Sequence, residues 1–155
     1  MNISDRPVAI VTGGSRGVGA ATAKLLASKG WNVTVTCTSS IEDADSIVKE
    51  CEALNAEALA LSADVSDDEA CKNTAQQTLK NWGRIDALVN NAGTTKFVFN
   101  HGDLDGLDAE DFLHIYKVNV VGPFQMVRAC KESLLTSKNP SVVNISSIAG
   151  IKGIG

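Results

Sequence analysis

A glycine-rich turn between a short apolar segment and a helix-patterned segment is the feature that most constrains this chain. Residues 12–19 read Thr-Gly-Gly-Ser-Arg-Gly-Val-Gly and directly follow the apolar residues 8–11. Glycine permits a sharp turn and a close approach of the backbone to a bound group, because it has no Cβ. The N-terminus of the following helix offers unpaired N–H groups and a favourable dipole to an anion. The sequence therefore predicts a seat for the pyrophosphate of a dinucleotide. The candidate cofactor-binding residues of this turn are Gly13, Ser15, Arg16, Gly17, Val18 and Gly19.

The spacing of these glycines excludes two other phosphate-binding motifs. Neither the G-x-G-x-x-G fingerprint nor the G-x-x-x-x-G-K-[ST] phosphate loop can be aligned here, since Ala20 stands where a lysine would be needed. The pattern is T-G-x-x-x-G-x-G. Nucleotide-sugar epimerases and dehydratases usually space their glycines as G-x-x-G-x-x-G, so the turn disfavours that class of enzyme as well.

Composition bounds the class of protein. A chain of 155 residues with 44% hydrophobic content is expected to form one globular domain over residues 1–155. The net charge of −4 and the lack of a basic run argue against nucleic-acid and membrane partners. The polar first seven residues do not resemble a signal peptide, so we expect a cytoplasmic protein.

No metal site is expected. The cysteines lack zinc-like spacing, and we interpret all four as reduced, mostly buried thiols. Residues 103–111 are acidic, but Leu107 holds the third ligand position of an EF-hand pattern. We interpret these carboxylates as solvating a loop and favouring the N-terminus of the helix that follows.

Strand and helix patterns alternate along the chain. Apolar or β-branched strands are expected at 8–11, 32–38, 58–63, 85–89 and 142–145. Helices are expected up to Gly30, from Ile41 to Leu54, from a capping box of Ser66 and Glu69 to Trp82, around residues 112–116, and from Phe124 to Leu135. This order predicts an α/β fold with a doubly wound parallel sheet, in which ligands gather at the carboxyl ends of the strands.

Four segments at those strand ends resemble the short-chain dehydrogenase/reductase family, closest to its 3-oxoacyl-carrier-protein reductases. They are residues 12–19, residues 63–65, the Asn-Asn-Ala-Gly run at 90–93, and Asn119 followed by Val-Val-Asn-Ile-Ser-Ser at 142–147. The resemblance covers essentially the whole chain. It implies a Rossmann fold and a nicotinamide-dependent oxidoreductase that acts on a small carbonyl or alcohol substrate.

The resemblance also implies roles for single residues. Asp64 would hydrogen-bond the adenine amine and Val65 would back the ring. Asn119 would hold a water of the proton relay, and Ser147 would hydrogen-bond the substrate carbonyl. Structural alternatives are that Asp64 caps a turn, that Asn119 satisfies backbone groups, and that Ser147 lies in an ordinary strand-end turn. The residues that would line the cofactor and steady the central sheet are Asn91, Ala92 and Gly93.

Cofactor choice follows from charge. An NAD site usually places a carboxylate at the end of the second strand, where it binds the ribose 2′-hydroxyl and repels a 2′-phosphate. Here that position is Thr38-Ser39, and no acidic residue occurs between Gly19 and Glu42. Arg16 carries forked donors suited to a phosphate. The sequence therefore favours NADP(H) over NAD(H).

The family's Tyr-x-x-x-Lys pair is not among these residues, because the single tyrosine, Tyr116, is followed directly by Lys117. We therefore expect the N-terminal portion of a longer single-domain enzyme, with a sheet that is incomplete at the C-terminus. By itself this portion should bind a nucleotide weakly and should not catalyse hydride transfer. The alternative is a non-catalytic dinucleotide-binding module. A homotetramer is expected by analogy with the family.

Overall fold

A parallel sheet forms the centre of the protein in the computed structural model, which describes residues 6–100 and 102–152. The strand order is β3-β2-β1-β4-β5, with every neighbouring pair parallel. The chain first moves outward from β1 to β3 and then returns to add β4 on the other side of β1. The predicted doubly wound α/β fold is therefore confirmed, with its switch point between β1 and β4. The strands are β1 (Val8–Val11), β2 (Asn32–Cys37), β3 (Ala58–Ser62), β4 (Ala87–Asn90) and β5 (Ser141–Asn144).

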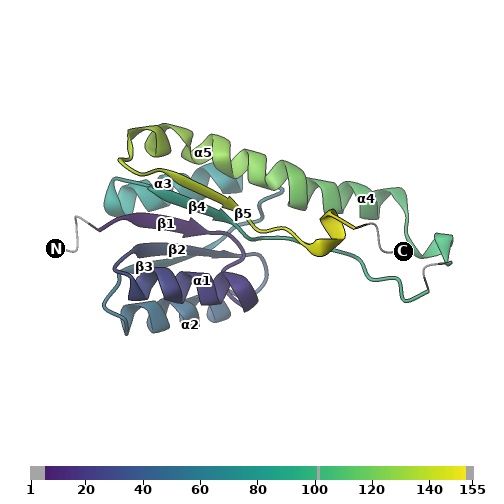
Figure 1. Ribbon diagram of the computed structural model, residues 1–155, viewed down its shortest axis with the longest axis horizontal. Helices are drawn as coiled ribbons and strands as arrows, with labels where there is room; N and C mark the ends of the chain where they lie inside the picture. Colours follow the sequence, from purple (N-terminus) through teal and green to yellow (C-terminus); the bar gives the residue numbers. More distant parts are fainter. Residues whose placement is uncertain (1–5, 101, 153–155) are drawn as a thin grey trace.

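Helices cover both faces of this sheet (Figure 1). α1 and α2 lie on one face, and α3 and α5 lie on the other. Each pair encloses an apolar cluster against the sheet, one around Val33, Val35 and Ile47 and the other around Ile85, Leu88 and Met126. The helices are α1 (Gly17–Ser28), α2 (Ile41–Glu52), α3 (Asp68–Trp82), α4 (Ala109–Tyr116) and α5 (Gly122–Thr136).

The four cysteines belong to these packed layers. All are buried, and none forms a disulfide. Burial is the largest cause that raises the pKa of Cys71 to about 11 and that of Cys130 to about 12. Both side chains therefore remain protonated thiols at neutral pH and act as small apolar groups. The interpretation of the cysteines as mostly buried thiols is confirmed.

Two predicted helix boundaries are wrong. The N-cap of α3 is Asp67, whose side chain accepts a hydrogen bond from the backbone N–H of Glu69, and not Ser66. Ser66 instead donates its backbone N–H to Asp64 and belongs to the preceding turn. The helices expected around residue 112 and from Phe124 are also continuous, because a π-helical segment, Lys117–Val121, joins α4 to α5.

The acidic segment before α4 caps the helix. Asp108 and Asp111 form a reciprocal capping box, and Lys96 pairs with Asp111 at 2.5 Å. Asp103 accepts a hydrogen bond from the backbone N–H of Asp105 in the short 3-10 helix Leu104–Gly106. The interpretation of these carboxylates as helix-start residues is confirmed.

The outer strand β5 is more exposed to solvent than the central strands. Every residue of β1 is buried, whereas Val142 and Val143 of β5 remain 42% and 46% exposed. Such an edge presents unpaired backbone groups and apolar side chains that can pair with another strand.

Among the described helices, none combines the length and apolar character needed to cross a membrane.

A buried carboxylate joins the amino ends of the central strands, opposite the strand ends that carry the glycine turn. Asp86 accepts hydrogen bonds from the backbone N–H of Val8 at 2.9 Å and from Ser137 Oγ at 2.7 Å. The guanidinium of Arg84 donates to both of its oxygens at 2.7 and 2.8 Å. Burial raises the pKa of Asp86, but these hydrogen bonds and the Arg84 charge outweigh it, so the pKa lies below its ordinary value.

Replacing this carboxylate should destabilise the fold. In Asp86→Asn, one carboxylate oxygen is replaced by an amide NH₂ group, which cannot accept the hydrogen bonds that the donors around Asp86 supply. We therefore expect the free energy of unfolding to fall by about 2–4 kcal/mol at neutral pH. The wild-type free energy of unfolding should fall between about pH 5 and pH 3, where the unfolded chain binds a proton that folded Asp86 still excludes. Urea titrations at several pH values test both effects, with the exposed Asp105→Asn as control. Equal acid sensitivity of wild type and Asp86→Asn would contradict this account.

Candidate functional site

The glycine turn after β1 leaves no room for a Cβ at Gly13, Gly14 or Gly19, and Gly13 and Gly19 face the segment that follows β4. Gly13 has a φ of +61°, and a Cβ there would lie 2.9 Å from the Ala92 Cα atom. A Cβ on Gly19 would lie 2.5 Å from Asn91 Nδ2 and 2.6 Å from the Gly13 carbonyl oxygen. The turn is therefore packed directly against the segment that follows β4, as the sequence predicts for a strand-to-helix bend at the carboxyl edge of the sheet.

Hydrogen bonds between Thr12 and Asn91 hold this contact in place. The side-chain Nδ2 of Asn91 donates to the carbonyl oxygens of Thr12 and Gly13, both at 2.9 Å. In return, Thr12 Oγ1 accepts the backbone N–H groups of Asn91 and Ala92, both at 3.0 Å. Because each of these side chains bonds to the backbone of the other strand end, the two strand ends are fixed relative to each other.

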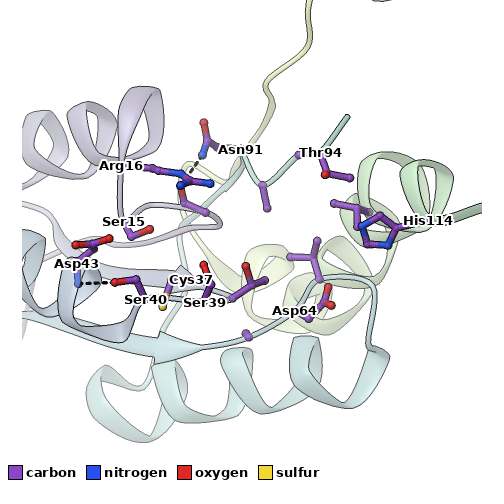
Figure 2. Close-up of a pocket in the computed structure, with 17 residues that line it drawn as sticks. Ser15, Arg16, Cys37, Ser39, Ser40, Asp43, Asp64, Asn91, Thr94 and His114 are labelled. Atoms are coloured by element: carbon purple, nitrogen blue, oxygen red, sulfur yellow. Dashed lines mark hydrogen bonds between the residues drawn. The ribbon is translucent and has the colours of Figure 1, made fainter. Parts of the chain in front are cut away.

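An open pocket of about 410 Å³ lies over these strand ends (Figure 2). It is formed by the glycine turn and by the segments after β2, β3 and β4, with α4 and the π-helical segment at one side. Ten of the predicted cofactor-binding residues line it. They are Gly13, Ser15, Arg16, Thr38, Ser39, Asp64, Val65, Asn91, Ala92 and Gly93.

Three predicted residues of the turn do not line the pocket. Gly17 and Val18 lie in the exposed first turn of α1, with Val18 60% exposed. Gly19 is buried beneath Asn91 and acts through the close packing described above. All three residues belong to the start of α1, which directly follows the lining residues 13, 15 and 16.

The structure adds residues that the sequence reasoning missed. Ser40 and Asp43 line the pocket because α2 begins shortly after β2. Ser40 is the N-cap of α2, and its Oγ accepts the backbone N–H of Asp43 at 3.3 Å. The Ser40-to-Asp43 spacing is that of an N-cap and its third helical residue, a signal that was available in the sequence. The other lining residues that were missed are Cys37, Ala63, Thr94, His114 and Val118.

The segment after β3 combines a turn with one wall of the pocket. Asp64 Oδ1 accepts the backbone N–H of Ser66 at 2.9 Å. This carboxylate therefore caps a turn, which is the structural role that the sequence leaves open for it. Val65 is buried, and its carbonyl oxygen accepts a hydrogen bond from Gln125 Nε2 at 2.8 Å. A Cβ on Gly122 would lie 2.7 Å from the Val65 side chain, so the start of α5 packs tightly on this wall.

Asn119 lies in the π-helical segment and contacts the loop that follows β4. Its Oδ1 accepts the backbone N–H of Thr94, and its Nδ2 donates to the carbonyl oxygen of the same residue, both at 2.8 Å. Asn119 does not line the pocket itself, but Thr94 does. The residue thus satisfies backbone groups, though those of a neighbouring loop rather than of its own helix. Single π-helical turns inside helices are frequent at functional sites.

Ser147 follows β5 and lies outside the pocket lining. Its Oγ accepts the backbone N–H of Ala149 at 3.2 Å and caps the 3-10 helix Ile148–Gly150. The strand that leads to it is held in register, because Asn90 Nδ2 donates to Asn144 Oδ1 at 2.9 Å. Ser147 is exposed, and its position is set by the β4–β5 pairing.

Comparisons with known proteins agree with this geometry. The family model described as short chain dehydrogenase matches residues 7–155. The 3-oxoacyl-[acyl-carrier-protein] reductase of Synechocystis sp. is 38% identical over 146 residues, which are 94% of this chain and 58% of that protein. The FabG reductase of Staphylococcus aureus is 31% identical over 94% of this chain and 57% of its own length. The chain thus spans less than three fifths of these two curated relatives.

Solved structures share the same arrangement. A metagenomic short-chain oxidoreductase in complex with NADP superposes with a TM-score of 0.87 at 34% identity, over 98% of this chain and 67% of that one. A 3-oxoacyl-[acyl-carrier protein] reductase from Brucella melitensis in complex with NAD gives a TM-score of 0.84 at 32% identity, over 97% and 59%. The glycine turn, the Asn91 network and the family match over residues 7–155 lead to one conclusion: the chain belongs to the short-chain dehydrogenase/reductase family.

Proposed function

We propose that this chain forms the dinucleotide-binding part of an NADPH-dependent carbonyl reductase. The reaction is hydride transfer between NADP(H) and the carbon of a ketone or secondary alcohol. The observation that carries the proposal is the pocket at the switch point of the sheet, where a turn without room for a Cβ meets the Asn91 network. Because two relatives are named as 3-oxoacyl-carrier-protein reductases, a 3-oxoacyl thioester is the first substrate to test.

The residues present fit a dinucleotide. The close approach at Gly13 and Gly19 leaves the turn narrow enough for phosphates to reach the backbone N–H groups at the start of α1. Asp64 and Val65 form the wall that would take the adenine. When bound, the nicotinamide supplies the hydride, and the chain's part is to hold and orient it.

The 2′-phosphate of NADP(H) would lie at the end of β2. Thr38 and Ser39 line the pocket there, and Arg16 lines it from the glycine turn. A guanidinium binds a phosphate through two parallel charge-assisted hydrogen bonds, which supports NADP(H) over NAD(H). Related structures contain either dinucleotide, so the preference is a proposal that rests on this chain's own residues.

Ser147 and Asn119 would act on the substrate side. Ser147 Oγ uses a lone pair to accept from Ala149, and its hydroxyl proton would be donated to the substrate carbonyl oxygen. The side chain of Asn119 is engaged with Thr94, so a water of the proton relay would bind its backbone carbonyl. Residue 123 is proline and has no N–H, so the Asn119 carbonyl lacks its usual α-helical donor. This backbone feature supports the water-holding role.

Titration of both reduced dinucleotides against the chain tests the cofactor proposal. We expect NADPH to bind more tightly than NADH, as measured by the increase in their fluorescence. Arg16→Ala should weaken NADPH binding by about tenfold, equivalent to one lost charge-assisted contact, and should change NADH binding by less than about twofold. Arg128→Ala, which removes an arginine outside the pocket lining, serves as the matched control. Tighter binding of NADH than of NADPH to the wild type would overturn the proposed preference.

Hydride transfer is tested in a form of the protein that also carries a Tyr-x-x-x-Lys pair after Ser147. We expect Ser147→Ala to lower kcat/KM for a 3-oxoacyl thioester by about 100-fold, as for the loss of one hydrogen bond to a developing oxyanion. NADPH affinity should stay the same, because Ser147 does not line the dinucleotide pocket. Ser146→Ala is the matched control, and NADPH oxidation at 340 nm is the assay. Equal activity of wild type and Ser147→Ala would refute the assigned role, and NADPH binding without turnover of any carbonyl would favour the non-catalytic module.

A further inference from the structure

The charges that line the dinucleotide pocket are not those of a simple phosphate site. Arg16 is the one arginine or lysine among the described lining residues, whereas Asp43 and Asp64 both contribute carboxylates. Asp64 lies on the wall assigned to the adenine. Asp43 has no role in the binding scheme above, although it lines the pocket from the helix that follows β2, and the 2′-phosphate would lie at the end of that strand.

Local helix geometry determines where Asp43 lies. Ser40 caps α2 and accepts the backbone N–H of Asp43, so Asp43 is held in the first turn of the helix that follows β2. Figure 2 shows Asp43 on the same side of the pocket as Ser15 and Ser40, whereas Asp64 and His114 lie on the opposite side. Because the backbone of Asp43 makes the capping bond, changing only its side-chain charge leaves this cap in place.

The negative charge of this helix start acts at the end of β2. Burial is the largest effect on the pKa of the Cys37 thiol and raises it, a backbone hydrogen bond at Ser40 lowers it, and the carboxylates of Asp45, Glu42 and, least of the three, Asp43 raise it. Cys37 is the last residue of β2 and itself lines the pocket. Of these three carboxylate residues only Asp43 lines the pocket, so its charge would face a 2′-phosphate bound at the end of β2, and like charges repel.

We propose that Asp43 is a specificity-determining residue, which weakens binding of the 2′-phosphate and thereby limits the preference of the pocket for NADP(H) over NAD(H). This inference rests on the proposed function, since it assigns a role within the same dinucleotide pocket. Arg16 attracts the phosphate and Asp43 opposes it, so the selectivity is the difference between the two interactions. No acidic residue occurs between Gly19 and Glu42, but Asp43 follows directly after that stretch, so the site suits a phosphate less well than the stretch alone suggests.

Removing this one charge tests the inference. Asp43→Asn should lower the Kd for NADPH by about three- to tenfold, the range for a charge interaction in a partly exposed site. The Kd for NADH should change by less than about twofold, because NADH has no phosphate at that position. The matched control is Glu42→Gln, which removes the same charge from the same helix turn but from a residue outside the pocket lining. Binding is measured by titration calorimetry at low and high salt, and thermal unfolding verifies that each variant is folded.

The outcomes separate this inference from the proposed function. A larger gain in NADPH affinity for Asp43→Asn than for Glu42→Gln, reduced at high salt, supports the role of Asp43. Equal effects of the two variants overturn it, because the gain would then reflect net charge alone. Loss of NADH affinity in Asp43→Asn also overturns it, because the carboxylate would then hold the ribose hydroxyl. A wild-type chain that binds neither dinucleotide overturns the proposed function, and this inference with it.

Discussion

The contact between the turn after β1 and the segment after β4 is the constraint on which the site depends. These strands are neighbours only because the chain reverses its winding direction at this point of the sheet. Asn91 and Thr12 convert that proximity into a defined geometry by pairing with each other's backbone. A Cβ at Gly13 or Gly19 would separate the two segments. The narrow floor of the pocket follows from this single junction.

The two ends of the same strands serve different purposes. At the amino ends, the buried carboxylate of Asp86 accepts hydrogen bonds from the Val8 N–H and from the partly exposed Arg84 guanidinium. At the carboxyl ends, residues of the glycine turn such as Ser15 and Arg16 line an open cavity. Hydrogen bonds at the amino ends of the strands can therefore hold the sheet in place, while polar side chains at the carboxyl ends remain available to a ligand.

In the proposed scheme, cofactor selectivity is a balance of opposing charges. Arg16 and Asp43 come from different elements, and both line the pocket that includes the end of β2. Neither residue alone indicates which dinucleotide is preferred, because a 2′-phosphate is attracted by one and repelled by the other. Related structures contain NADP in one case and NAD in another, which fits a fold whose preference depends on a few such side chains.

Sequence patterns alone gave the elements of the fold and most of the pocket. The apolar runs predicted the strands to within two residues, and the glycine turn and the Asn-Asn-Ala-Gly run predicted residues that meet in the pocket. The errors are local ones. Ser66 and Asp67 both suit an N-cap, and the choice depended on the turn at Asp64. The continuous helix through residues 117–121 has no simple sequence signal, because π-helical turns depend on packing.

The sequence by itself determined the order of strands and helices, the position of the glycine turn and the family to which the chain belongs, because these depend on local periodicity and on glycines at particular spacings. Only the tertiary structure decided which side chains share the pocket. Asp43 and His114 reach it from helices that are remote from the glycine turn in the chain. Parallel winding brings all strand ends to one edge, and the charge balance at that edge is a property of their assembly in space.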